Sequence, residues 1–321
     1  MARILIVTPA PRGSRKGNRI TANRWSRLLK ASGHKVRIAE EFTGQRCDVL
    51  IAFHARKSAS SIDRCIQASP ETPIILLLTG TDLYEDIHRK KSASAALDKA
   101  SRLVLLQSHG ICELPPRLHP KVRVVVQSAV RPQSAPQRSK RVFEVCVSGH
   151  LRPVKDPFRA ALASRTLPAD SRIQITHIGS ALSPAMERRA LDEMARNDRY
   201  RWLGETPSWR ARQLLARSRL LVLSSKMEGG ANVVSEAIAA SVPILASRIS
   251  GSIGLLGENY PGYFDVGSTK QLTSLMTRFE TDADFFELLC AHVKKLAPQF
   301  TPEREQAAFE QLIADVLNSA A

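Results

Sequence analysis

Residues 220–237 read Leu220-Leu-Val-Leu-Ser-Ser-Lys-Met-Glu228-Gly-Gly-Ala-Asn232-Val-Val-Ser-Glu236-Ala237. A short apolar run, typical of a buried strand, is followed by a glycine-containing loop and a helical pattern, for which Asn232 is the expected N-cap. The two glycines allow the backbone to approach a ligand closely. The free N–H groups of a first helical turn, with the helix dipole, bind phosphate oxygens. The stretch therefore predicts a strand–loop–helix unit with an anion site at its loop.

The same alternation of apolar runs and helical patterns extends over most of the chain. We expect strands at residues 4–8, 36–39, 48–53, 73–78 and 103–107, and again at 142–148, 174–179, 220–225 and 243–246. Such alternation is typical of an α/β fold in which a parallel sheet is covered by helices on both faces. Doubly wound sheets of this kind bind ligands beyond the carboxyl ends of their strands.

A polar segment with two prolines interrupts the pattern near the middle of the chain, and 321 residues suffice for two domains. We expect an N-terminal Rossmann-like domain at residues 1–130, a linker at 131–141 and a C-terminal Rossmann-like domain at 142–300. Residues 301–321 are expected to form an amphipathic helix, for which packing back on the N-terminal domain is one option.

Several classes of protein are disfavoured by simple features of the sequence. No apolar stretch approaches the length of a membrane-spanning helix, and the apolar run at residues 4–7 is too short for a signal peptide. The five cysteines form no CxxC pair, which argues against a zinc site or a disulfide framework. These features favour a cytoplasmic protein that holds no metal or other cofactor and has no stable membrane association.

The net charge of +17 is the one unusual bulk property, and it suits a partner that carries negative charge. The basic residues form no run of five or more, and only 5% of residues are aromatic, which leaves little to stack on nucleic acid bases. Small anionic substrates are therefore favoured over nucleic acid, and the oligomeric state is left open.

The two glutamates of the opening stretch suit the binding of a nucleotide. Glu228 lies in the loop, near whatever extends beyond the phosphates, and Glu236 lies about one turn inside the helix, where a carboxylate can accept hydrogen bonds from ribose hydroxyls. The alternative is a glycine-rich turn with two solvated glutamates.

A resemblance favours the nucleotide site. The spacing from Glu228 to Glu236 resembles the E-x7-E motif of the family 4 glycosyltransferases, and Gly149-His-Leu-Arg152-Pro-Val-Lys155 resembles the stretch that opens their second domain. The resemblance implies a GT-B fold, with two Rossmann-like doubly wound domains facing across a cleft. It also implies that Arg152 and Lys155 hold the donor diphosphate in place of a metal ion, although two surface charges are the alternative. With Glu228 as a third catalytic residue, the donor site would then consist of Gly17, Asn18, Gly149, Arg152, Lys155, Gly179, Leu203, Glu228, Gly229, Gly230, Ala231, Asn232, Val233 and Glu236.

Cationic and polar side chains follow three expected strands of the N-terminal half. We expect them to line an acceptor site, although solvated surface charges are the alternative for each one. The candidates are Arg12, Arg15, Lys16, Arg19, His54, Arg56, Lys57, Thr79, Thr81 and Asp82.

A narrower resemblance covers nearly the whole chain. The segments around His54, Thr79, Gly149 and Glu228 look like those of the selenosugar synthases of selenoneine biosynthesis, which join selenophosphate to the anomeric carbon of UDP-N-acetylglucosamine. The resemblance implies a 1-seleno sugar as product, after loss of phosphate. Two departures from other family 4 enzymes fit it: Gly230 replaces the usual aromatic residue, and no histidine stands at residues 79–82. A selenophosphate anion needs no base to activate it.

Two alternatives to this function are kept. In the first, the donor site is unchanged and the acceptor is a lipid or another small molecule. In the second, the protein is a non-catalytic, basic nucleic-acid-binding protein, with a binding affinity that falls steeply with salt.

Overall fold

The computed structural model describes residues 1–134 and 137–318. The described chain divides into two compact units. Unit 1 comprises Met1–Ser128, Glu228–Gly230 and the chain from Pro302, and unit 2 comprises Ala129–Met227 and Ala231–Thr301. The division falls within a few residues of the expected linker, of which residues 135–136 lie outside the described part.

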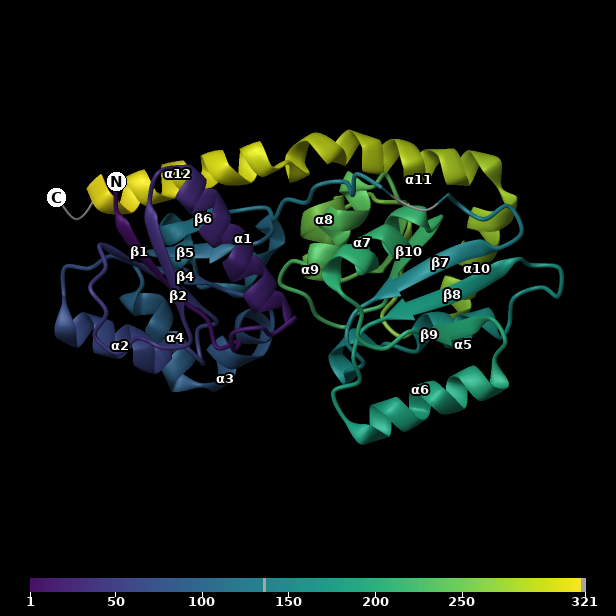
Figure 1. Cartoon of the computed structure of the whole chain (residues 1–321), viewed down its shortest axis with the longest axis horizontal. Helices are drawn as coiled ribbons and strands as arrows, with labels where there is room; N and C mark the ends of the chain where they lie inside the picture. Colours follow the sequence, from purple (N-terminus) through teal and green to yellow (C-terminus); the bar gives the residue numbers. More distant parts are fainter. Residues whose placement is uncertain (135–136, 319–321) are drawn as a thin grey trace. The chain divides into compact units, whose positions relative to one another are not determined.

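Unit 1 contains a parallel sheet with the strand order β2-β1-β3-β4-β5-β6 (Figure 1). Its central strands form where the sequence has unbroken apolar runs, because a strand covered on both faces buries every side chain. The bounds are β1 (Arg3–Val7), β2 (Lys35–Ala39), β3 (Val49–Phe53), β4 (Ile74–Leu77), β5 (Arg102–Leu105) and β6 (Val122–Val124).

Helices cover both faces of this sheet. Because successive side chains of a strand point to opposite faces, Ile4 and Ile6 of β1 face one hydrophobic core, and Leu5 and Val7 face the other. The first core is closed by α1 (Gly17–Ala31) and α12 (Pro302–Asn318), and the second by α2 (Ala59–Ala68) and α4 (Lys91–Lys99). Short helical segments complete the unit: η1 (Asp82–Asp86), α3 (Ile87–Arg89), η2 (Ser108–Glu113) and η3 (Pro116–Lys121).

The C-terminal helix α12 packs against α1 through aromatic and polar contacts. The Trp25 ring lies edge-on between those of Phe53 and Phe309, with centroids 5.0 and 4.4 Å away. The Trp25 Nε1–H donates to Glu305 at 3.0 Å, and this carboxylate is buried. The last helix therefore belongs to the core of unit 1.

Unit 2 contains a second parallel sheet, with the order β12-β11-β10-β7-β8-β9 (Figure 1). Its strands are β7 (Phe143–Ser148), β8 (Ile173–Ile178), β9 (Tyr200–Trp202), β10 (Leu220–Leu223), β11 (Ile244–Ser247) and β12 (Tyr263–Phe264). The helical elements are η4 (Pro153–Lys155), α5 (Arg159–Ser164), α6 (Pro184–Arg196), α7 (Ser208–Arg217), α8 (Asn232–Ala239), α9 (Ser250–Leu256), α10 (Thr269–Thr281), α11 (Ala283–Leu296) and η5 (Ala297–Phe300).

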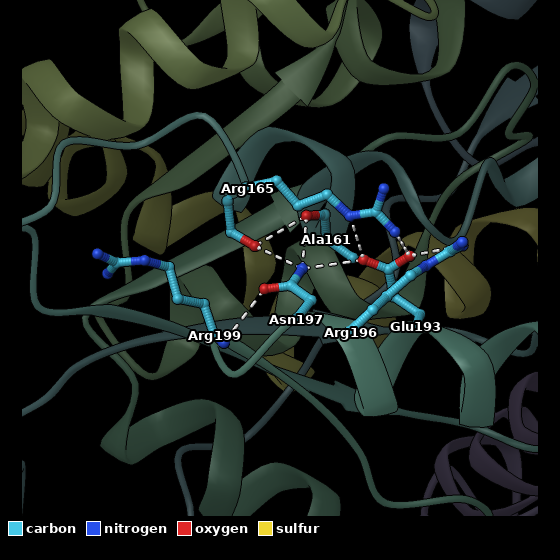
Figure 2. A network of polar contacts seen from close by, with 7 residues as sticks. Ala161, Arg165, Glu193, Arg196, Asn197 and Arg199 are labelled. Carbon is cyan, nitrogen blue, oxygen red and sulfur yellow. Dashed lines mark hydrogen bonds and ion pairs between the residues drawn. The ribbon is translucent and has the colours of Figure 1, made fainter.

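A buried polar network ties α6 to α5, as Figure 2 shows. Glu193 of α6 is buried and pairs with the guanidinium of Arg165, whose Nε donates to it at 2.9 Å. Asn197 donates to Glu193 at 2.9 Å and to the Ala161 carbonyl at 3.0 Å, while its own oxygen accepts from the Arg199 N–H at 3.2 Å. Buried networks with satisfied groups are rigid, so α6 is firmly attached to the rest of unit 2.

None of the helices formed by residues 1–134 and 137–318 is long and apolar enough to cross a membrane.

Candidate active site

The loops that follow β1, β3 and β4 carry most of the expected acceptor residues. These strands are adjacent and parallel in the sheet of unit 1, so their carboxyl ends lie at one edge. Five of the candidate cations at this edge have exposed side chains: Arg12, Arg15, Lys16, Arg56 and Lys57. These loops therefore share one edge of the unit 1 sheet, and the acceptor role of their residues stays a prediction.

Gly17 and Asn18, two of the expected donor residues, are the first residues of α1, because this helix begins directly after Lys16. Arg19 lies in the first turn and is buried, with 9% of its surface exposed. No hydrogen-bond partner for its Nε is found in the described part of the chain.

Asp82 has a different role from the expected contact with an acceptor. Its carboxylate is fully buried and accepts hydrogen bonds from the N–H groups of Thr79 (2.8 Å), Gly80 (2.9 Å) and Ala55 (2.9 Å). The Thr79 hydroxyl donates to it as well, at 3.0 Å. Asp82 therefore joins the loops after β3 and β4, because a buried carboxylate needs several donors to offset its desolvation.

His54 lies beside this carboxylate in an unusual backbone conformation, with φ at +75°. Its Nε2 is 3.4 Å from the Thr81 hydroxyl and 3.8 Å from Asp86, which also pairs with Arg56 at 3.2 Å. Burial lowers the pKa of the His54 imidazole, although Asp82 and Asp86 favour its protonated form. A histidine thus reaches the loop at residues 79–82 from the neighbouring strand. The sequence prediction missed this, and missed Asp86, because it compared positions within one loop only.

Glu228, Gly229 and Gly230 are part of unit 1, although the sequence places them with the nucleotide-binding residues of the second domain. Glu228 is buried. A Cβ atom at Gly229 would lie 2.5 Å from the carbonyl carbon and oxygen of Thr79, and one at Gly230 would lie 2.4 Å from the Leu106 Cβ. Neither position accommodates a Cβ atom, so the packing requires glycine at both.

The remaining donor candidates lie in unit 2, in the stretches that follow β7, β8, β9 and β10. Gly149 follows β7, and its N–H donates to the Ile178 carbonyl at 2.8 Å. Gly179 follows β8 with φ at +144°, and a Cβ atom there would lie 2.1 Å from the Gly149 carbonyl oxygen. Leu203 follows β9 and donates its N–H to the His177 carbonyl at 2.9 Å. These three residues are brought to one edge of the sheet.

His177 holds the Gly149 loop from inside the core. Its Nε2 lies 3.2 Å from the Gly149 carbonyl, which can only accept, and its Nδ1 lies 2.9 Å from the Tyr200 hydroxyl. The Nε2 atom therefore carries a proton. Complete burial lowers the pKa of His177 to about 4, so the ring is neutral near pH 7.

Arg152 is the N-cap of the short helix η4, Lys155 is its last residue, and both are half-buried. The backbone beside these two residues is fixed to the loop that follows β10. The Ser224 hydroxyl donates to the Asp156 carbonyl at 2.9 Å, and the Lys226 N–H donates to the Val154 carbonyl at 2.8 Å. These bonds hold the stretch that carries both cations.

Helix α8 begins at Asn232, so Ala231 and not Asn232 occupies the N-cap position, and the expected cap is wrong. Alanine has no side-chain oxygen to bond the N–H groups of the first turn. Val233 is buried in that turn, and Glu236 lies one turn further on, half-buried. Ala231, Asn232, Val233 and Glu236 thus follow β10, next to β7 in the sheet.

The family model described as glycosyl transferases group 1 matches residues 131–296, more than half of the chain. The chain belongs to this family. It is 22% identical over 330 residues to glycosyltransferase 1 domain-containing protein 1 of Xenopus tropicalis, with 94% of each chain covered. The matched stretch includes all of the candidate residues of unit 2.

Solved structures of glycosyltransferases share the fold. HepE of Anabaena, solved in complex with UDP and glucose, has a TM-score of 0.76 at 16% identity, with 99% of this chain and 100% of that one covered. Sucrose-phosphate synthase of Thermosynechococcus elongatus has a TM-score of 0.81 at 14% identity, with 99% of each chain covered. The expected pair of Rossmann-like domains of the GT-B class is thereby confirmed.

Proposed function

We propose that this group 1 glycosyltransferase transfers N-acetylglucosamine from UDP-N-acetylglucosamine to selenophosphate. The selenium atom attacks the anomeric carbon, and the bond from that carbon to the diphosphate oxygen breaks, which releases UDP. Hydrolysis of the selenium–phosphorus bond then gives the 1-seleno sugar and phosphate. We assign no stereochemistry to the step.

The donor half of the proposal rests on the loops of unit 2. Breaking the glycosidic bond builds negative charge on the leaving diphosphate, and fixed cations stabilise such charge where it develops. Arg152 and Lys155 supply the cations on a stretch of backbone held by Ser224 and Lys226. The first turn of α8 supplies N–H groups, and Glu236 would accept from the ribose hydroxyls.

The acceptor half rests on the cations after β1 and β3. Arg12, Arg15 and Lys16 are exposed at the same sheet edge as Arg56 and Lys57, an arrangement that suits a small, highly charged anion. An anionic selenium nucleophile needs no deprotonation, whereas a hydroxyl acceptor does. The exposed cations at one edge are the observation that carries this half.

Release of UDP with matched acceptors tests the proposal. The protein is incubated with UDP-N-acetylglucosamine and either enzymatically generated selenophosphate or orthophosphate. We expect UDP release that depends on selenophosphate. Equal release with orthophosphate, or release only with an added polyprenyl phosphate, would contradict the acceptor assignment and leave the donor assignment standing.

Neutralising four cations together tests where the anion binds. In the combined variant of Arg15, Lys16, Arg56 and Lys57, each changed to Gln, we expect the KM for selenophosphate to rise at least tenfold. An unchanged KM and kcat would refute the acceptor site. Independence from divalent metal stays a prediction, which turnover in the presence of EDTA checks.

A further inference from the structure

Gln127 lies just after β6, in the interior of unit 1, and has three hydrogen-bond partners. Its Oε1 accepts from the Thr21 hydroxyl at 2.9 Å and from the Arg24 guanidinium. Its Nε2 donates to the carbonyl oxygen of Gly230 at 2.8 Å. Only 3% of the residue is exposed, so water does not compete effectively for these bonds.

The direction of the amide follows from its neighbours. A guanidinium can only donate, so the atom that faces Arg24 must be the amide oxygen. The amide nitrogen is then left facing Gly230, whose carbonyl can only accept. A flipped amide would oppose donor to donor at one end and acceptor to acceptor at the other, which leaves buried polar groups unsatisfied.

Arg24 is in turn fixed by the buried carboxylate of Glu305 on α12. Its Nε lies 3.0 Å from Glu305 Oε2, and the same carboxylate accepts from the Trp25 Nε1–H and from the Ser128 N–H at 2.9 Å. Gln127 therefore sits at the end of a buried network that runs from the last helix through α1.

The loop that Gln127 holds has little freedom elsewhere. The backbone of Gly230 packs against Leu106, and that of Gly229 packs against Thr79, so tightly that neither position accommodates a Cβ atom. The Gln127 bond adds a directional constraint to these contacts. Glu228 precedes Gly230 by two residues, so the fixed backbone of Gly229 and Gly230 also determines where Glu228 lies.

We propose that Gln127 is a positioning residue for Glu228, which acts by holding the Gly230 carbonyl. The inference rests on the proposed function, because it takes Glu228 to be a residue that turnover requires. Because Gln127 is buried, its effect reaches the reaction through the backbone of residues 228–230.

The substitution Gln127→Glu isolates the decisive bond. A carboxylate still accepts from Thr21 and Arg24 but has no hydrogen to donate to Gly230. We expect kcat to fall about tenfold, the rate equivalent of one lost buried hydrogen bond, with less than about a twofold change in donor KM. The matched control Thr21→Val removes a different bond of the same side chain, and we expect a fall in kcat below about threefold. If Gln127→Glu does not fold, Gln127→Met, which loses all three bonds of the side chain, is compared with Thr21→Val, and its kcat should be the lower of the two.

Hydrogen exchange of the free protein gives a second readout that needs no substrate. In Gln127→Glu the backbone amides of residues 228–231 should exchange faster than in the wild type, while those of β3 exchange at the same rate. An unchanged exchange rate, or an unchanged kcat in an active protein, overturns the inference. If the wild type releases no UDP at all, the proposed function fails and the exchange experiment alone decides the role of Gln127.

Discussion

The buried carboxylate of Asp82 accepts a hydrogen bond from the backbone N–H of Ala55, at 2.9 Å. This bond joins the loop after β4 to the loop after β3, which carries the exposed side chains of Arg56 and Lys57. Asp82 thus holds the backbone of the loop that carries two cations of the proposed acceptor site.

Asp82→Asn tests this arrangement, because the amide can keep the bonds from Thr79 and Gly80 but opposes its own donor to the Ala55 N–H. We expect a loss of about 1–3 kcal/mol in the free energy of unfolding of unit 1, and a higher acceptor KM. Asp86→Asn, which breaks a half-exposed pair with Arg56, should cost less than about 1 kcal/mol. Urea unfolding of both variants makes the comparison, and equal losses would contradict the role given to Asp82.

The fold was predictable from local patterns, and most contacts of the site were not. The buried runs around Leu50 and Leu221 are apolar throughout, so their strands were expected within one or two residues of the observed ends. The strands β6, β9 and β12 were not predicted as strands from apolar runs, because they are two or three residues long and partly exposed. Gln127 and Gly230 are 103 residues apart in sequence, and no local sequence pattern predicts a hydrogen bond between residues so far apart.

The glycines of unit 2 allow a matched comparison. Gly179→Ala places a methyl group 2.1 Å from the Gly149 carbonyl oxygen and strains a positive φ, whereas Gly149→Ala meets open space. We expect Gly179→Ala to lower the melting temperature of unit 2 by several degrees, and Gly149→Ala to leave it within about one degree. Equal melting temperatures in differential scanning calorimetry would count against the close packing of these two loops.

The two glutamates of the opening motif should affect different kinetic constants. Glu236→Ala removes an acceptor for ribose hydroxyls, so we expect a donor KM at least fivefold higher with little change in kcat. Glu228→Ala should instead lower kcat at least tenfold. Glu71→Ala serves as the control, because Glu71 lies just before β4, at the amino ends of the unit 1 strands. If both glutamate variants change both constants equally, the division of roles is wrong.

His177 predicts how stability depends on pH. Its pKa is about 4 in the folded protein and about 6.5 in an unfolded chain, so the unfolded chain binds more protons between these values. The stabilisation by the neutral ring is complete above pH 6.5 and is lost as the pH falls toward 4, by about 2 kcal/mol at pH 5. In His177→Gln the difference in unfolding free energy between pH 7.5 and pH 5 should shrink by about that amount. An unchanged difference would show that His177 is not the group responsible.

The mass of the sugar product tests the central proposal most directly. The protein is incubated with UDP-N-acetylglucosamine and selenophosphate, and the hexosamine products are analysed by high-resolution mass spectrometry. We expect a hexosamine ion with the isotope pattern of one selenium atom, formed together with UDP and absent without the protein. UDP release accompanied only by selenium-free sugar would contradict the transfer to selenium.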